Sequence, residues 1–303
     1  MATRTRTFGA GNRESHDASA FYARFTAPEL TDDDTVNPCG AADTVICGDA
    51  RDMRDVADNS VALVVTSPPY FAGKAYELAL GEGHIPATYL EYLTMLRDVF
   101  AECRRVLEPG GRMCVNVANL GRRPYRSLAG DVTTILQDEL AMLLRGEIIW
   151  VKAKGASGSC AFGSWMKASN PVLRDVTERV VVASKGSFGR VPNLQKRIEL
   201  GLPHESDISK DEFLASTLDV WEIRPERARR VNHPAPFPVE LPERLIRLYT
   251  YVDDVVLDPF LGSGSTAVAA VQNGRRYVGY DTDPEYVAIA EARIAQAAAT
   301  TAD

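Results

Sequence analysis

The sequence contains no hydrophobic run that approaches the roughly 20 residues needed to cross a membrane. Its five cysteines form no CxxC pair and have no histidine at ligand spacing, so neither a zinc site nor a disulfide framework is predicted, and no metal is expected. No apolar segment follows the basic first residues, which argues against a secretory signal. These absences predict a cytoplasmic protein without a membrane partner.

A positive net charge is also missing, because the 303 residues carry a net charge of -7. Overall acidity is not typical of a nucleic-acid binder. The charges are unevenly distributed, however, since residues 145–232 contain 15 Lys and Arg against 11 Asp and Glu. One basic segment therefore lies on an otherwise acidic chain.

Short β-branched runs alternate with amphipathic helical stretches from Thr44 onward, which predicts an α/β fold with a doubly wound, parallel sheet. Strands are predicted at residues 44–47, 62–66, 112–117, 147–152, 179–184, 255–257 and 277–280. Helices are predicted at residues 89–107, 128–145, 238–249, 265–273 and 284–297.

Two segments interrupt this alternation. Residues 1–38 are polar and lack sustained periodicity, so we expect a loosely held arm before a single domain at residues 39–303. The stretch at about residues 153–217 is rich in Gly and Ser in places and breaks the pattern. Insertions of this kind often carry specificity.

A glycine loop follows the predicted strand at residues 255–257 and reads Asp258-Pro-Phe-Leu-Gly-Ser-Gly-Ser-Thr266. Glycines let the backbone approach a ligand closely, and the helix that follows offers free N–H groups. The next strand ends on Asp281, where an acid can bind ribose hydroxyls. The third glycine of a dinucleotide fingerprint and the GK[ST] of a P-loop are both missing. A nucleoside cofactor without a pyrophosphate fits this pattern best.

A rigid turn, Thr66-Ser-Pro-Pro-Tyr70, stops the predicted strand at residues 62–66. Two prolines fix φ and lack N–H donors, so local carbonyls face outward as acceptors. An exocyclic amine could donate one hydrogen to the Ser67 hydroxyl and one to the Pro68 carbonyl, which would aim its lone pair at a methyl group. Tyr70 could stack on a base extruded from the helix.

Together these motifs resemble the amino-methyltransferases of DNA, in the permuted β group whose catalytic turn precedes the cofactor loop. The resemblance covers about residues 44–294. It implies a Rossmann-like sheet that is mostly parallel with one antiparallel strand, and S-adenosylmethionine as the cofactor. In that family Ser-Pro-Pro-Tyr is associated mainly with N4-cytosine methylation and Asp-Pro-Pro-Tyr with N6-adenine, so Ser67 favours cytosine.

The resemblance also implies individual roles. Asp49 stands where the family has an acid for the adenine amine of the cofactor, and Phe237 and Pro238 would flank its methionine part. The expected catalytic residues are Ser67, Pro68, Pro69 and Tyr70. The expected cofactor-binding residues are Asp49, Thr66, Phe237, Pro238, Asp258, Pro259, Phe260, Gly262, Ser263, Gly264, Thr266 and Asp281.

Double-stranded DNA is the expected partner, with basic side chains on its phosphates. The residues expected there are Arg122, Arg123, Arg126, Lys152, Lys154, Arg227, Arg229 and Arg230. A homodimer and a restriction endonuclease that acts on the same site are further partners that the resemblance allows. The stretch at about residues 153–217 is similar to the family's target-recognition region, but it does not give the recognition sequence.

Several alternatives stay open. The same machinery could methylate the N6 amine of adenine, amines of RNA or protein, or could survive in a non-catalytic DNA-binding relative. Pro38-Cys39 is reminiscent of the nucleophile of C5-cytosine methylation, but it lies before the first strand and has no Glu-Asn-Val partner. We therefore predict an N4-cytosine methyltransferase, with N6-adenine methylation as the nearest rival.

Overall fold

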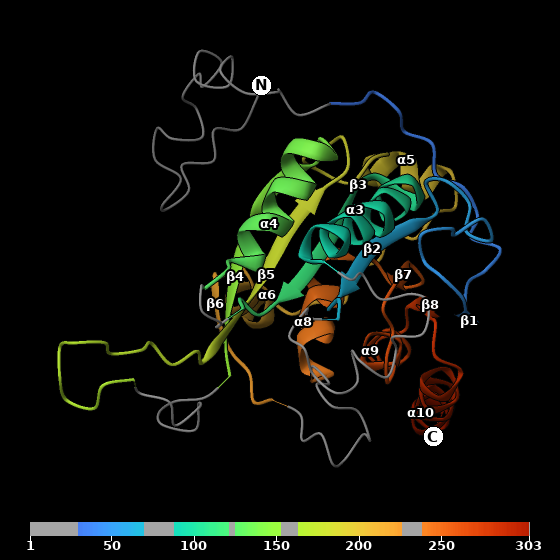
Figure 1. Ribbon diagram of the computed structural model, residues 1–303. Coiled ribbons are helices and arrows are strands. Elements are labelled where there is room, and N and C mark those ends of the chain that lie inside the picture. Colours follow the sequence, from blue (N-terminus) through green and yellow to red (C-terminus); the bar gives the residue numbers. More distant parts are fainter. Residues whose placement is uncertain (1–29, 70–87, 121–124, 153–162, 226–237, 303) are drawn as a thin grey trace.

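The computed structural model describes residues 30–69, 88–120, 125–152, 163–225 and 238–302. These residues contain a sheet of eight strands in the order β1-β8-β7-β2-β3-β5-β4-β6 (Figure 1). Their bounds are β1 Thr44–Cys47, β2 Val61–Thr66, β3 Leu107–Val117, β4 Leu143–Val151, β5 Thr177–Ser184, β6 Val220–Glu222, β7 Val255–Asp258 and β8 Arg276–Asp281.

One strand runs against the others. β5 pairs antiparallel with both β3 and β4, whereas β1, β8, β7, β2 and β3 pair in parallel and β4 pairs in parallel with β6. The expectation of a mostly parallel sheet with one antiparallel strand is confirmed. The parallel strands place their carboxyl ends at one edge of the sheet, which is where ligands bind in open α/β folds.

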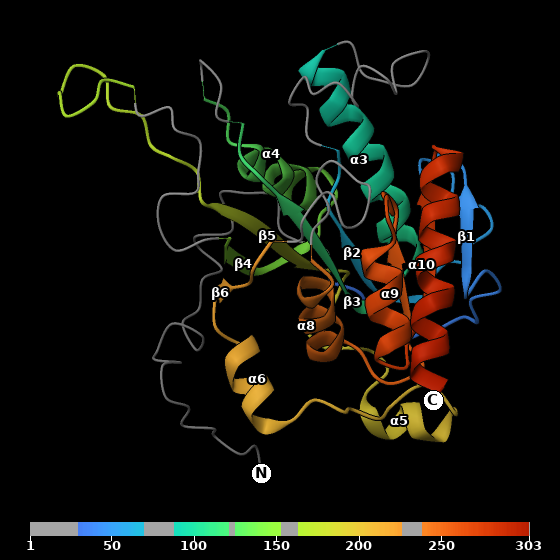
Figure 2. The ribbon, with the colours of Figure 1, turned by 90° about the horizontal axis from the view of Figure 1, so that it is seen from below.

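Helices cover both faces of the sheet (Figures 1 and 2). The helices α3 and α4 lie on one face, and α8, α9 and α10 lie on the other. Their bounds are α3 Tyr89–Val106, α4 Leu128–Thr134, α8 Glu240–Tyr249, α9 Ser265–Gln272 and α10 Pro284–Ala302, with the shorter α5 Leu194–Glu199 and α6 Lys210–Ser216 outside these layers. In the described part of the chain, no helix is both long and apolar enough to span a bilayer.

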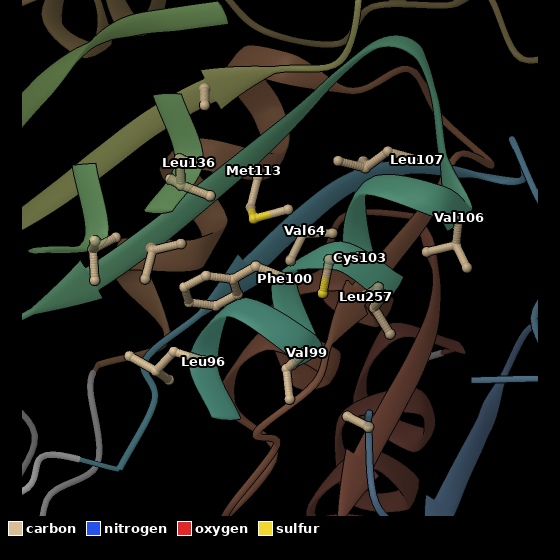
Figure 3. Close-up of a cluster of buried hydrophobic side chains, with 14 of the residues drawn as sticks. Val64, Leu96, Val99, Phe100, Cys103, Val106, Leu107, Met113, Leu136 and Leu257 are labelled. Atoms are coloured by element: carbon tan, nitrogen blue, oxygen red, sulfur yellow. The ribbon is translucent and has the colours of Figure 1, made fainter. Parts of the chain in front are cut away.

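β2 shows why the apolar runs become central strands. All six of its residues are buried, as expected for a strand that is covered on both faces. Val64 belongs to the core under α3 and contributes with Phe100 and Met113 to the cluster in Figure 3. Leu63 and Val65 belong to the core under α8 and α9. Alternate side chains of one strand thus join the two helical layers.

Several predicted boundaries differ from the structure. The helix predicted at residues 128–145 is wrong at its end. α4 passes into a π-helical turn, η1 Ile135–Glu139, and the chain then turns at Ala141, whose φ is 49°. Residues from Leu143 onward belong to β4 instead. α5, α6 and β6 were not predicted. They are short and carry several exposed apolar side chains, so they lack the periodicity of a packed element.

The last part of the predicted arm is attached to the body of the protein. The Thr31 N–H donates to the Gly186 carbonyl at 2.8 Å, and the Asn37 N–H donates to the Asn59 carbonyl at 2.9 Å. The Asn59 side chain also donates to Asp33 at 2.8 Å. Residues 30–38 therefore lie along the amino edge of the sheet. The rest of the predicted arm is outside the described residues.

Four charged side chains form a buried cluster at this amino edge. Glu108 accepts hydrogen bonds from Arg190 at 2.7 Å and from Arg197 at 3.0 Å. Asp254, just before β7, accepts from Arg190 at 2.9 Å and from Arg197 at 3.4 Å. The charges balance, and the Arg197 side chain is fully buried. The cluster ties the segment after β5 to the starts of β3 and β7.

We expect Glu108→Gln to destabilise the protein by about 3 kcal/mol, because it leaves two buried guanidinium groups facing one carboxylate. Urea denaturation measures the loss. Arg276→Ala, which breaks the exposed Arg276–Asp43 pair, is the control and should have a much smaller effect. Equal losses for the two variants would contradict a structural role of the cluster.

Candidate functional site

The two sequence motifs meet at the carboxyl edge of the sheet. β2 and β7 are parallel neighbours, with Val64 opposite Leu257. Thr66 ends β2 and Asp258 ends β7, and the Thr66 hydroxyl donates to Asp258 Oδ1 at 2.7 Å. The turn that begins at Ser67 and the loop that begins at Pro259 therefore start side by side.

Asp258 is fully buried between the two motifs. Its Oδ2 accepts a hydrogen bond from the Thr266 hydroxyl at 2.6 Å, and its Oδ1 also accepts from the Phe260 N–H at 3.1 Å. Burial raises the pKa of Asp258 to about 6, although these hydrogen bonds act in the opposite direction. Thr66 and Thr266 are buried as well. Through these hydrogen bonds the three buried side chains hold the glycine loop in place.

Glycines are required in the loop between β7 and α9. Gly262 and Gly264 have φ values of 52° and 82°, which favour residues without a Cβ. A Cβ on Gly264 would also lie 3.0 Å from the Cβ of Ala290 in α10. The loop is connected to β8, because the Gly262 N–H donates to Asp281 Oδ2 at 2.8 Å.

Acidic side chains follow three adjacent strands at this edge. Asp281 ends β8 beside Asp258, and Cys47 at the end of β1 pairs with Asp281, which brings Asp49 to the same place. Asp281 Oδ1 accepts from the Asp283 N–H at 2.9 Å, and burial raises the pKa of Asp281. Asp49 is partly exposed and pairs with Arg51. The predicted acids thus come together.

Ser67 contacts a polar network that sequence reasoning missed. Asn116, on β3, donates from Nδ2 to Ser67 Oγ at 3.4 Å and to Glu178 Oε2 at 2.6 Å. Lys152 donates to Glu178 Oε1 at 2.9 Å. Asn116 and Glu178 are buried, whereas Ser67 is half-buried. The sequence signal was weak, because Asn116 is one polar residue in the apolar run 113–117 and Glu178 stands between Thr177 and Arg179 at the start of β5.

The remaining predicted residues fall into two groups. Pro238 is buried just before α8, and Pro259, Phe260 and Ser263 lie in the glycine loop, where Ser263 accepts a hydrogen bond from Arg293 at 2.9 Å. Arg126 is exposed and pairs with Asp131 at 2.8 Å, while the charge of Lys152 is matched by Glu178. The residues outside the described part are Tyr70, Arg122, Arg123, Lys154, Arg227, Arg229, Arg230 and Phe237.

The chemistry of this edge suits a nucleoside cofactor with a positively charged group. Carboxylates can accept hydrogen bonds from ribose hydroxyls and amines, and they attract a cation. Asp49 and Asp281 provide such acceptors at the ends of adjacent strands, beside a loop whose glycines allow close approach. Among the described residues, no group of three or more His, Cys, Asp and Glu could hold a metal ion.

Comparison with known proteins gives the family. The family model described as DNA methylase, of the N6/N4 methyltransferases, matches residues 61–292. The Type II methyltransferase M.MjaI of Methanocaldococcus jannaschii is 30% identical over 282 residues, which cover 82% of this chain and 90% of that protein. The DNA adenine methyltransferase YhdJ of Escherichia coli is 26% identical over 255 residues, which cover 81% of this chain and 80% of that protein. The chain therefore belongs to the N6/N4 DNA methylase family.

Solved structures agree with this assignment. TTHA0409 of Thermus thermophilus, in complex with S-adenosyl-L-methionine, is 30% identical, with a TM-score of 0.65. The match covers 84% of this chain and 93% of that chain. The cytosine-N4-specific PvuII DNA methyltransferase has a TM-score of 0.63 at 22% identity, with coverage of 86% and 90%, and shows likeness in fold alone. The Rossmann-like methyltransferase fold expected from the sequence is confirmed.

We expect Asp258 to make the protein less stable as the pH rises from about 4 to about 6. Its pKa is raised to about 6 in the folded protein, whereas an unfolded Asp titrates near about 3.9, so between these values only the folded protein keeps the proton. Relative to Asp258→Asn, the wild type should gain about 1 kcal/mol between about pH 7 and about pH 5. Urea denaturation of both proteins checks this, and parallel pH profiles would contradict it.

Proposed function

We propose that this DNA methyltransferase transfers a methyl group from S-adenosylmethionine to the N4 amine of an extruded cytosine in duplex DNA. The observation that carries the proposal is the contact between Thr66 and Asp258, which joins the Ser-Pro-Pro-Tyr turn to the glycine loop. The hydrogen bond places the proposed amine acceptor beside the proposed cofactor loop. This arrangement suits direct transfer of a methyl group between two bound molecules.

S-adenosylmethionine is the cofactor, and its sulfonium would supply an activated methyl group and leave as the neutral thioether S-adenosylhomocysteine, while the methylated amine releases one proton to solvent. Asp281 and Asp49 would accept hydrogen bonds from its ribose and adenine, and Gly262 and Gly264 would let the backbone approach it. Asp258 is proposed to act indirectly. It is buried, and it would position Thr66 and Thr266 instead of contacting the cofactor. Phe237 and Pro238 are proposed to flank the methionine part.

The target amine is proposed to lie against the turn after β2. Ser67 Oγ and the Pro68 carbonyl would each accept one amine hydrogen, which orients the nitrogen lone pair, while Pro69 keeps the turn rigid and Tyr70 stacks on the base. Asn116 holds Ser67 Oγ, and the carboxylate of Glu178 fixes the orientation of that amide. Asn116 and Glu178 are therefore positioning residues for Ser67.

Cytosine is proposed as the target because a neutral hydroxyl, Ser67, occupies the first position of the turn. The resemblance of this turn to N4-cytosine enzymes supports the choice. Adenine N6 is the second candidate, and the similarity to YhdJ, which is named as a DNA adenine methyltransferase, favours it. The Type II relatives also support a proposed role beside a restriction endonuclease that acts on the same site.

Nucleoside mass spectrometry separates the two targets. DNA from a methylation-deficient host that expresses this chain should contain N4-methylcytosine and no new N6-methyladenine. The opposite result would replace cytosine with adenine in the proposal. Sequencing of the methylated positions in the same DNA gives the recognition sequence, and a host whose DNA carries neither base would refute the proposed function.

Ser67→Ala and Asp281→Asn should affect different steps. Ser67→Ala should lower the single-turnover rate by about 100-fold while calorimetry shows an unchanged Kd for S-adenosylmethionine, because only an amine acceptor is lost. Asp281→Asn keeps an acceptor for the Gly262 N–H but loses the charge, so the Kd should rise about tenfold. A weakened Kd in Ser67→Ala would mean that Ser67 belongs to the cofactor pocket.

A further inference from the structure

The connection between β4 and β5 carries a loop that projects from the body of the protein (Figures 1 and 2). We call residues 163–173 the projecting loop. A bridge between Gly163 and Pro171 joins its two sides. β4 ends and the antiparallel β5 begins at the carboxyl edge of the sheet, so the loop leaves from the same edge that carries Ser67.

Local hydrogen bonds give this loop a defined shape. The Ser164 N–H donates to the Asn170 carbonyl at 2.9 Å, and the Asn170 N–H donates to Ser164 Oγ at 2.8 Å. The Ser164 hydroxyl in turn donates to the Lys167 carbonyl at 2.6 Å. Met166, at the turn, has φ 52°, which is an unfavourable conformation for a long side chain. The loop is thus folded on itself and does not bury its apolar side chains.

Apolar side chains on the loop face solvent. Met166 is 88% exposed, Leu173 is 97% exposed and Trp165 is 64% exposed. Lys167 and Arg174 add two positive charges, and the segment from Gly163 to Arg174 contains no acid, although the whole chain is acidic. Duplex DNA carries negative phosphates outside and stacked, largely apolar bases inside. A surface that combines positive charge with exposed apolar groups suits such a partner.

The base of the loop is connected to the proposed amine site. The Lys152 N–H donates to the Val176 carbonyl at 3.0 Å where the two strands diverge. Two residues further on, Glu178 binds Asn116, and Asn116 contacts Ser67. The loop and the turn that would receive an extruded base are therefore held by one short stretch of β5.

We infer that the projecting loop inserts Met166 and Leu173 into the DNA base stack beside the target nucleotide and fills the space that the extruded base leaves. Lys167 and Arg174 would contact the flanking phosphates. This inference rests on the proposed function, because it needs a base that leaves the duplex. Apolar side chains that enter base steps are a general way to stabilise distorted DNA. An extruded base otherwise returns to its stack.

Comparing two duplexes tests the inference. Both carry the recognition sequence found by methylation sequencing, and the target base is either normally paired or opposite an abasic site. The double variant Met166→Gly and Leu173→Ala should slow single-turnover methylation at least about tenfold on the paired duplex, because extrusion is no longer supported. On the duplex with the abasic site the loss should be under about twofold, since the base is already unpaired.

The control is the double variant Phe213→Ala and Leu214→Ala on α6, which removes two other exposed apolar side chains away from this edge. It should match the wild type on both duplexes. Equal slowing of the projecting-loop variant on both duplexes, or no slowing on either, would overturn the inference and leave the proposed function standing. A wild type that methylates neither duplex would refute the proposed function itself.

A second copy of this chain is the alternative binding partner of the projecting loop. Analytical ultracentrifugation of the same proteins distinguishes it. If the wild type is a dimer that the loop variant converts to a monomer, and the variant slows both duplexes equally, the loop is a contact between subunits and the inference is wrong. Wild type and variant of the same mass, with slowing confined to the paired duplex, support insertion into DNA.

Discussion

The carboxyl edge of this protein depends on one buried carboxylate. Asp258 accepts hydrogen bonds from Thr66 and Thr266, and it thereby joins the end of β2, the end of β7 and the start of α9. Ser67 follows Thr66 directly, and the glycine loop follows Asp258. Because both motifs start from this contact, the distance between Ser67 and the glycine loop is set by the core and not by surface segments.

The two edges of the sheet use buried charge differently. At the amino edge, Glu108 and Asp254 are balanced by Arg190 and Arg197, so the charges compensate one another and stabilise the fold when all four are present. At the carboxyl edge, Asp281 is bound by the backbone N–H groups of Gly262 and Asp283. Neutral N–H donors do not compensate the charge of this carboxylate, which suits the proposed binding of a cationic cofactor at this edge.

Local patterns carried most of what could be predicted from the sequence. Apolar β-branched runs followed by Thr66 and Asp258 gave both strands, and parallel topology placed their ends together. The contacts of Asn116 and Glu178 could not be predicted, because a polar residue in a strand does not show by itself which neighbour it faces. The early end of the helix that begins at Leu128 could not be predicted either, because the chain turns at Ala141 in a left-handed conformation that alanine rarely adopts.

β5 links the proposed recognition of DNA to the proposed chemistry. As the antiparallel strand, it starts at the carboxyl edge, so Glu178 lies one residue inside the strand while the projecting loop lies just before it. Only a few residues separate the proposed DNA contact in the loop from Glu178. Glu178 orients Asn116, and Asn116 contacts Ser67. A parallel strand in this position would start at the opposite edge, and the loop could not lie beside the amine site.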